Sequence, residues 1–211
     1  MSQVHAPSEN KAKPGSNEGP QPIRGLHHWA YKCRDAEETR HFYEDVLGLP
    51  LVHIIRADDV PSTGQHCPYV HLFFEMTDGS CVAFFDLGDD IAPDPSPNTP
   101  AWVNHMALRV DSLEALAKMK AHLEANGIPV RGEIDHHFVK SIYFFDPNGY
   151  MLEITVQTRP FLKEDFSDAS MTLEAAMHLE AEGERGGAGL QSIDDVWRAK
   201  AELIETAARG L

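Results

Sequence analysis

The stretch His28-Trp-Ala-Tyr-Lys-Cys-Arg-Asp35 recurs in altered form as His105-Met-Ala-Leu-Arg-Val-Asp111. Each copy begins with histidine, has alanine two places on, alternates in polarity and ends in aspartate. Alternation with period two is typical of a half-buried β-strand, and an aspartate after a strand can cap a helix. An internal repeat decides the architecture, so we expect two copies of one structural unit.

The segments after each copy predict the rest of the unit. Amphipathic helices are expected over residues 36–47 and 112–125, each ended by a glycine. Asp78-Gly79 is a two-residue turn signal, and Asp146-Pro-Asn-Gly149 fits a type I turn between two strands. The order β-α-β-β-β therefore occurs twice, which predicts an α+β fold of two tandem βαβββ modules around a curved, barrel-like cleft.

The composition of the remaining segments predicts the domain boundaries. We expect a disordered tail over 1–22, a first module over 23–91, a Pro-rich linker over 92–100, a second module over 101–158 and a C-terminal helical extension over 159–211. In the extension, helices near 170–184 and 193–209 are separated by a Gly-rich run over 183–189. This extension either covers its own core or pairs with another subunit.

Charge and cysteine content exclude several kinds of partner. The formal net charge of −15 repels phosphate backbones, so nucleic acid is not expected as a partner. No run reaches the ~18 apolar residues that a membrane span needs, and residues 1–22 lack the apolar core of a secretory signal. The three cysteines are odd in number, which fits a reducing compartment without disulfides. The sequence thus predicts a cytoplasmic protein with no membrane partner.

Strand parity separates an apolar face from a mixed face in each repeat. In the first strand Trp29, Tyr31 and Cys33 share the apolar face, so His28 lies on the other. His105 lies on the mixed face of the second strand for the same reason. The two histidines occupy equivalent positions, and they converge if the units pack as pseudo-symmetric halves.

A carboxylate falls on the same kind of face. The three-residue loop 147–149 pairs Asp146 with Tyr150 and therefore Tyr143 with Glu153, and directly opposed residues project from one face. Alternate Leu, Ile and Val residues of the last strand form its apolar side, which leaves Glu153 on the mixed side. A carboxylate there needs water, a cation or a hydrogen bond.

These three residues together predict a metal site. One histidine on a strand face is usually structural, and so is one strand-end carboxylate. Two histidines at equivalent positions of the repeats, together with a glutamate on the same kind of strand face, are harder to explain by structural roles alone. His28, His105 and Glu153 match the facial arrangement of non-heme Fe(II) oxygenases, which also suits other divalent ions.

The chain resembles the vicinal oxygen chelate superfamily of glyoxalases, fosfomycin- and bleomycin-resistance proteins and type I extradiol dioxygenases. The resemblance covers residues 23–158. It rests on His28-Trp-Ala-Tyr with Asp35, His41-Phe-Tyr-Glu-Asp-Val-Leu-Gly-Leu49, His105-Met-Ala-Leu-Arg-Val110 and Tyr143-Phe-Phe-Asp-Pro-Asn-Gly-Tyr-Met-Leu-Glu153.

Within that superfamily, Asp135-His136 followed by Tyr143 and Glu153 looks like the extradiol catechol dioxygenases. The resemblance implies that His136 is an acid/base near the metal and that Tyr143 donates a hydrogen bond to bound substrate or oxygen. His137, of opposite strand parity, is the alternative to His136. The resemblance also implies Fe(II) as the metal, with a catechol-like diol and O₂ as the substrates. We further expect a homo-oligomer, and we expect His71 to line the same cleft.

Two other functions remain open at this point. A glyoxalase-like isomerase or lyase would use Ni(II), Zn(II), Co(II) or Mn(II) and a fourth protein ligand. Counting back from a two-residue Asp78-Gly79 turn pairs His71 with Asp86, so Asp86 is either that ligand or an exposed strand-end carboxylate. The third reading is a metal-free drug-binding module, and the complete set of metal ligands argues against it.

Overall fold

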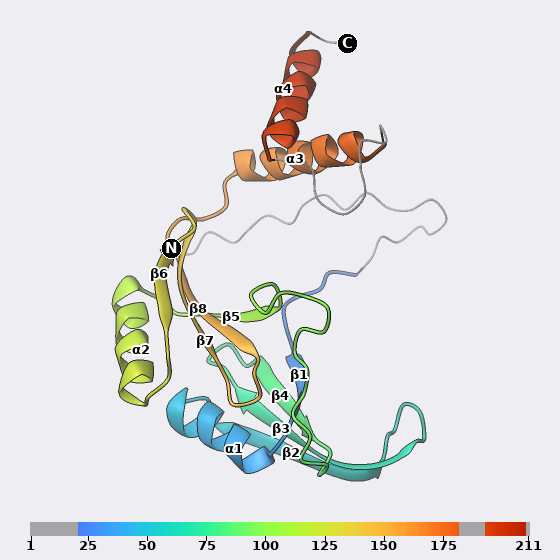
Figure 1. The fold of residues 1–211 in the computed structure, drawn as a ribbon, viewed down its shortest axis with the longest axis vertical. Coiled ribbons are helices and arrows are strands. Elements are labelled where there is room, and N and C mark those ends of the chain that lie inside the picture. The colour runs from blue at the N-terminus through green and yellow to red at the C-terminus, as the bar shows by residue number, and fades with distance from the viewer. Residues whose placement is uncertain (1–20, 182–192, 210–211) are drawn as a thin grey trace. The chain divides into compact units, whose positions relative to one another are not determined.

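A computed structural model of the chain describes residues 21–181 and 193–209 (Figure 1). Most of the predicted tail over 1–22 and the whole Gly-rich run over 183–189 lie outside the described residues. The chain divides into two compact units. One consists of Met1–His105 and Phe145–Leu152, and the other of Met106–Phe144 and Glu153–Leu211.

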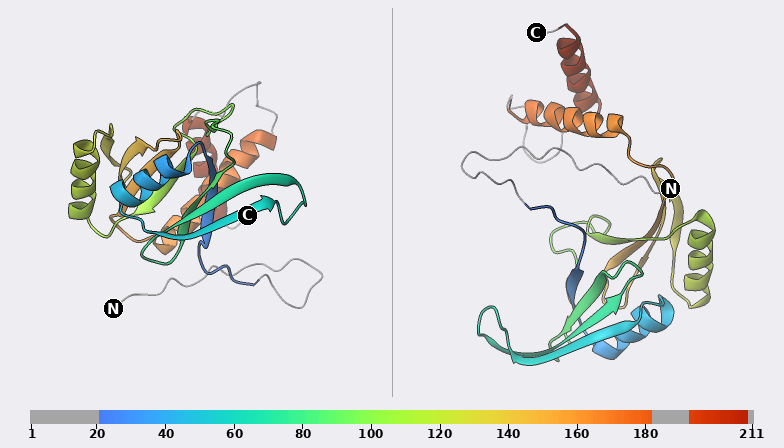
Figure 2. Two further views of the ribbon diagram at one scale, coloured as in Figure 1. Left: turned by 90° about the horizontal axis from the view of Figure 1, so that it is seen from below. Right: turned by 180° about the vertical axis from the view of Figure 1, so that it is seen from behind.

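The first unit contains a four-stranded sheet in the order β1-β4-β3-β2. Its elements are β1 (His28–Cys33), α1 (Ala36–Arg40), the π-helical turn η1 (His41–Val46), β2 (Leu51–Asp59), β3 (His66–Glu75) and β4 (Cys81–Asp86). β1 runs parallel to β4, whereas the other two pairings are antiparallel. Figure 2 shows β2 and β3 running together as a long curved ribbon.

The register confirms the predicted faces of β1. Trp29, Tyr31 and Cys33 pair with Val82, Phe84 and Asp86, and this face lies toward the helix. There the ring of Tyr43 in η1 packs against Phe74 and Phe84, with centroids 5.4 and 4.7 Å apart. His28, Ala30 and Lys32 pair with Cys81, Ala83 and Phe85 on the opposite face, called the inner face below.

The predicted helices form, with two local differences. Asp35 caps α1 by accepting from the Glu38 N–H at 2.7 Å, but the helix widens to a π-helical turn after Arg40. Ser112, expected inside the second helix, is instead its cap and accepts from the Ala115 N–H at 3.1 Å. Gly127, with φ +76°, follows that helix as expected.

The second sheet repeats the plan, with the strand order β5-β8-β7-β6. Its elements are β5 (His105–Arg109), α2 (Leu113–Ala125), β6 (Arg131–Asp135), β7 (Val139–Phe145) and β8 (Met151–Gln157). As in the first sheet, the first strand of the repeat lies beside the last. Both sheets and their helices confirm the α+β fold with two related modules.

The first hairpin has a different loop from the one predicted. The Met76 N–H donates to the Ser80 carbonyl at 2.8 Å, so three residues form the loop and Gly79 has φ +84°. The register therefore pairs His71 with Phe85, and the predicted pairing of His71 with Asp86 was wrong. A shift of one residue moves a side chain to the other face of the sheet. Asp86 consequently lies on the helix face, opposite to His71.

The tip of the second hairpin, residues 145–152, packs within the first unit. The Asp146 N–H donates to the Tyr150 carbonyl at 3.0 Å, which confirms the predicted three-residue loop. Buried Asp146 accepts from the Tyr43 hydroxyl at 3.0 Å and from the Tyr150 N–H at 2.7 Å. Asn148 accepts from the Arg34 N–H at 2.9 Å and donates to Thr39 Oγ1 at 3.1 Å. Polar contacts of this kind fix the tip in one position.

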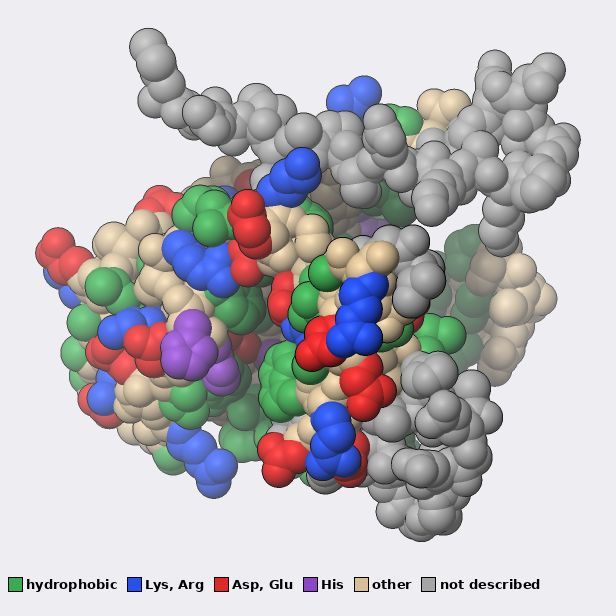
Figure 3. All heavy atoms as spheres, turned by 90° about the horizontal axis from the view of Figure 1, so that it is seen from above, with side chains coloured by type: hydrophobic (Ala, Val, Ile, Leu, Met, Phe, Trp, Pro, Cys, Tyr) green, Lys and Arg blue, Asp and Glu red, His purple; other side chains and the backbone are tan. Residues whose placement is uncertain are grey.

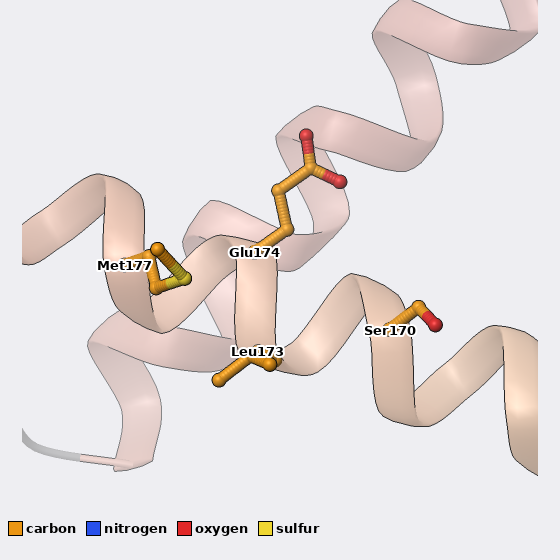
Figure 4. A pocket seen from close by; sticks show the side chains of 4 residues that line it. All are labelled: Ser170, Leu173, Glu174 and Met177. Carbon is orange, nitrogen blue, oxygen red and sulfur yellow. The ribbon is translucent and has the colours of Figure 1, made fainter. Parts of the chain in front are cut away.

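The C-terminal extension is a pair of helices, α3 (Lys163–Ala181) and α4 (Ile193–Arg209). α3 begins earlier than predicted, whereas α4 has the predicted bounds. Buried Ala175 and Ala199 lie between them, and Lys200 makes an ion pair with Asp168. A different side of α3 carries a shallow pocket lined by Ser170, Leu173, Glu174 and Met177 (Figure 4). None of the described helices is long and apolar enough to cross a membrane.

The described surface mixes charges of both signs, as Figure 3 shows for one face. On α1 and η1, Arg40 makes ion pairs with Glu37, Glu44 and Asp45 at 2.8, 2.8 and 3.0 Å. Exposed pairs of this kind contribute little to stability, typically ~0–1 kcal/mol. The fold therefore depends mainly on the buried face of each sheet.

Candidate metal and catalytic site

The second unit places Glu153 on β8 in a polar, buried position, only 6% exposed. The Ser141 hydroxyl of β7 donates to the Glu153 carboxylate and lies 3.0 Å from Thr155 Oγ1. Tyr143, two residues beyond Ser141, shares this face. Its pKa is raised by burial and then by the negative charge of Glu153, which keeps its hydroxyl protonated near neutral pH. Tyr143 is therefore a hydrogen-bond donor beside the carboxylate.

His136 completes this group. Its Nε2 lies 2.9 Å from the Tyr143 hydroxyl oxygen, and its backbone N–H donates to the Val139 carbonyl at 2.9 Å. His137 adopts a positive φ of 71°, and its N–H donates to Asp135 Oδ1 at 2.7 Å. Of the two histidines that the sequence left open, His136 is the one placed against Tyr143.

The first unit places His28 and His71 on the inner face, with ring centroids 6.2 Å apart. The ring centroid of Phe73 lies 5.4 Å from that of His28 and 4.2 Å from that of His71. His71 is buried, and its Nδ1 donates to the Phe84 carbonyl at 3.0 Å. Burial lowers the pKa of His71, so the ring is neutral at physiological pH and its Nε2 carries the lone pair. His28 Nδ1 lies 2.7 Å from His27 Nδ1, so one of these two rings donates to the other.

His105 begins β5. Its Nδ1 donates to the Val103 carbonyl at 3.2 Å, which assigns the lone pair to Nε2. Metal-binding histidines commonly have their second nitrogen held by a backbone carbonyl in this way. The local geometry of His105 thus suits a ligand, as does the chemistry of two imidazoles and one carboxylate.

The three predicted ligands are divided between the two compact units. Over residues 21–181 and 193–209, no three His, Cys, Asp or Glu side chains are placed together as a metal site. His28 and His105 belong to the unit that contains Met1–His105, and Glu153 belongs to the other. Convergence of the three residues remains a prediction.

Asp86 does not lie on the inner face. Its carboxylate accepts from the Ala36 N–H at 2.9 Å and from the Gly88 N–H at 2.7 Å, so it caps the start of α1 from the helix face. In the observed register, the position five residues after the middle of the loop is Ala83 in the first hairpin and Glu153 in the second. The first sheet therefore has an alanine where a second carboxylate ligand would stand.

Sequence reasoning missed two parts of this site. Ser141 was not recognised as the donor to Glu153, although its spacing of two from Tyr143 places it on the same face. The aromatic neighbours of His71, Phe73 and Phe85, were also missed, because the wrong register put Asp86 in the place of Phe85. A three-residue loop in the first hairpin, as in the second, would have paired His71 with Phe85.

A family model described as the Glyoxalase/Bleomycin resistance protein/Dioxygenase superfamily matches residues 25–154. This match spans more than half of the chain and includes every predicted ligand. The chain belongs to this superfamily.

Individual relatives are more distant. The chain is 23% identical over 146 residues to a protein of Bacillus subtilis (strain 168) named "Putative ring-cleaving dioxygenase MhqA". That match covers 69% of this chain but 44% of the relative, so the chain spans less than half of that protein's length.

Two solved structures are similar to this chain. A glyoxalase/dioxygenase from Nostoc punctiforme is 25% identical, with a TM-score of 0.50, covering 70% of this chain and 100% of that one. A lactoylglutathione lyase from Agrobacterium tumefaciens is 22% identical, with a TM-score of 0.46, covering 64% and 96%.

Proposed function

We propose that the chain is a metal-dependent ring-cleaving dioxygenase that acts on a catechol-like aromatic diol with O₂. The observation that carries the proposal is the group His136, Tyr143 and Glu153, in which an imidazole contacts a phenol beside a buried carboxylate. The name of the Bacillus relative supports this choice among the activities of the superfamily.

In this proposal His28, His105 and Glu153 hold the metal. Fe(II) is the proposed ion, and Ni(II), Zn(II), Co(II) or Mn(II) could bind the same donors. An ion held there would supply positive charge that eases the loss of protons from the diol hydroxyls. Only three protein ligands are required, which agrees with alanine rather than a carboxylate at position 83.

His136 is the proposed proton carrier. It accepts a proton from a diol hydroxyl and returns it to the ring-opened product, so no net proton is consumed. The bond between one hydroxyl-bearing carbon and the adjacent ring carbon outside the diol breaks, and both atoms of O₂ enter the product. The substrate supplies all four electrons that reduce O₂, so no further reductant is required.

Tyr143 and His71 are the proposed positioning groups. The protonated Tyr143 hydroxyl donates to a substrate or product oxygen on the side of Glu153. His71, neutral and fixed through Nδ1 to the Phe84 carbonyl, presents Nε2 on the same sheet face as His28. A fixed ring loses little entropy when it binds substrate, which favours a productive orientation.

Metal analysis and oxygen uptake on the full chain test the proposal. Protein purified without added metal should contain about one iron per metal site, and it should consume O₂ with at least one member of a catechol panel. Nickel or zinc without oxygen uptake, but with activity on thiohemiacetals, would favour the isomerase or lyase. No stoichiometric metal, together with binding of drugs, would favour the drug-binding module.

A further inference from the structure

The inner face of the first sheet is a continuous aromatic surface. The ring of His71 stacks on Phe85 with centroids 3.6 Å apart and planes at 6°, and Phe73 meets the edge of His71 at 4.2 Å. The ring centroid of His53 in β2 lies 5.8 Å from that of Phe73, and the centroid of Tyr69 lies 5.3 Å from that of Phe85. These five residues, from β2, β3 and β4, are called the aromatic wall below.

The aromatic wall starts beside His28. The rings of His28 and Phe73 are 5.4 Å apart, and Phe73 pairs with Ala83 one row along the sheet from the His28 row. The next row contains His71 and Phe85. Rows on one face are about 7 Å apart, so the wall extends over a length greater than one aromatic ring. A ligand held at His28 has the ring of Phe73 as its neighbour.

The charges around the aromatic wall disfavour an anion. Among the described strand residues of this face, Lys32 has the one fixed positive charge, and its Nζ is paired with Asp89 at 2.8 Å. Glu75 shares the row of His28 through Cys81 and adds a negative charge. Arg56 pairs with Val70 and lies on the other face. The described strand residues of the inner face therefore offer apolar contact but no uncompensated fixed cation.

We infer that the aromatic wall sets the substrate class of the proposed dioxygenase: aromatic diols with an apolar, uncharged ring substituent. This inference rests on the proposed function. The substituent packs against Phe73 and His53 while the diol lies at His28. Each buried CH₂ group strengthens binding about fourfold, whereas a carboxylate loses its hydration without gaining a cation.

Dissociation constants of diols for the Fe(II)-loaded full chain, measured without oxygen by calorimetry, test the inference. The probes are catechol, 4-ethylcatechol and 3,4-dihydroxybenzoate. The parent should bind 4-ethylcatechol about fifteenfold more tightly than catechol, and it should bind 3,4-dihydroxybenzoate most weakly.

Two arginine variants on β2 distinguish the effect of a charge placed at the aromatic wall from the effect of the same charge elsewhere on the strand. His53→Arg adds a cation beside Phe73 at an exposed position, so it should tighten binding of 3,4-dihydroxybenzoate at least fivefold. Ile54→Arg adds the same charge to the opposite face, where Ile54 pairs with Leu72 and is 49% exposed. It should leave all three dissociation constants within twofold of the parent.

The outcomes distinguish the inference from the function on which it rests. If the parent binds no diol, the proposed function fails and the inference fails with it. If the parent binds diols but prefers 3,4-dihydroxybenzoate, or if the two arginine variants respond alike, only the inference is overturned.

Discussion

Removing the hydroxyl of Tyr43 should destabilise the first unit measurably. Tyr43 is fully buried, and its hydroxyl donates to Asp146 Oδ2 at 3.0 Å, so Tyr43→Phe deletes one hydrogen bond to a carboxyl group. A hydrogen bond to a charged group contributes about 1.5–3 kcal/mol. The Tyr150 N–H and the Asn148 N–H, at 2.7 and 2.9 Å, still satisfy Asp146 Oδ1. We therefore expect a loss near the lower end of that range.

Urea denaturation followed by circular dichroism measures this loss. Tyr43→Phe should lower the midpoint without changing the slope m, because the exposed surface of the unfolded chain is unchanged. Tyr69→Phe, on a partly exposed tyrosine of the inner face, is the matched control and should change the midpoint little. Equal midpoints for Tyr43→Phe and the parent would refute the role of this hydrogen bond in holding the hairpin tip.

Three further predictions concern single residues. His136→Ala should retain metal but slow catechol turnover ~10²–10⁴-fold, while His137→Ala changes it little; stopped-flow assays and metal analysis compare the two. Asp86→Ala should keep its metal but lose about 1 kcal/mol of unfolding free energy, because the Ala36 N–H at the start of α1 loses its acceptor. Loss of metal from this variant would instead indicate that Asp86 is a ligand. Burial raises the pKa of Asp146 above 3.8, so the native state binds more protons and this group's contribution to stability falls as pH rises through the native pKa. Asp146→Asn should lack that part of the pH dependence in denaturation curves at several pH values, and an unchanged profile would contradict it.

Local patterns in the sequence were sufficient for the repeat, for the faces of β1 and for the second hairpin. Asp146-Pro-Asn-Gly149 specifies its turn strongly, because proline fixes one φ and glycine supplies a positive one. Asp78-Gly79 is less specific, since Asp-Gly fits a two-residue loop and also the end of a three-residue loop with a bulge. The loop is one residue longer than predicted, and this difference places Asp86 on the other face of the sheet.

Contacts distant in the sequence could not be predicted. Tyr43 and Asp146 are 103 residues apart, and no local pattern indicates that the tip of the second hairpin packs in the first unit. Strand parity likewise gives the face of His28, His105 and Glu153 but no distance between them. Parity correctly placed Tyr143 beside Glu153, because only one hairpin register is involved.

The fate of labelled oxygen tests the proposed ring cleavage most directly. The Fe(II)-loaded chain is incubated with 4-methylcatechol under ¹⁸O₂, and the product is examined by mass spectrometry. The proposal predicts a ring-opened product that contains both labelled atoms, and it predicts no such product from Glu153→Ala, which lacks the proposed carboxylate ligand. A product that gains no labelled oxygen, or an unchanged yield from Glu153→Ala, would contradict the account.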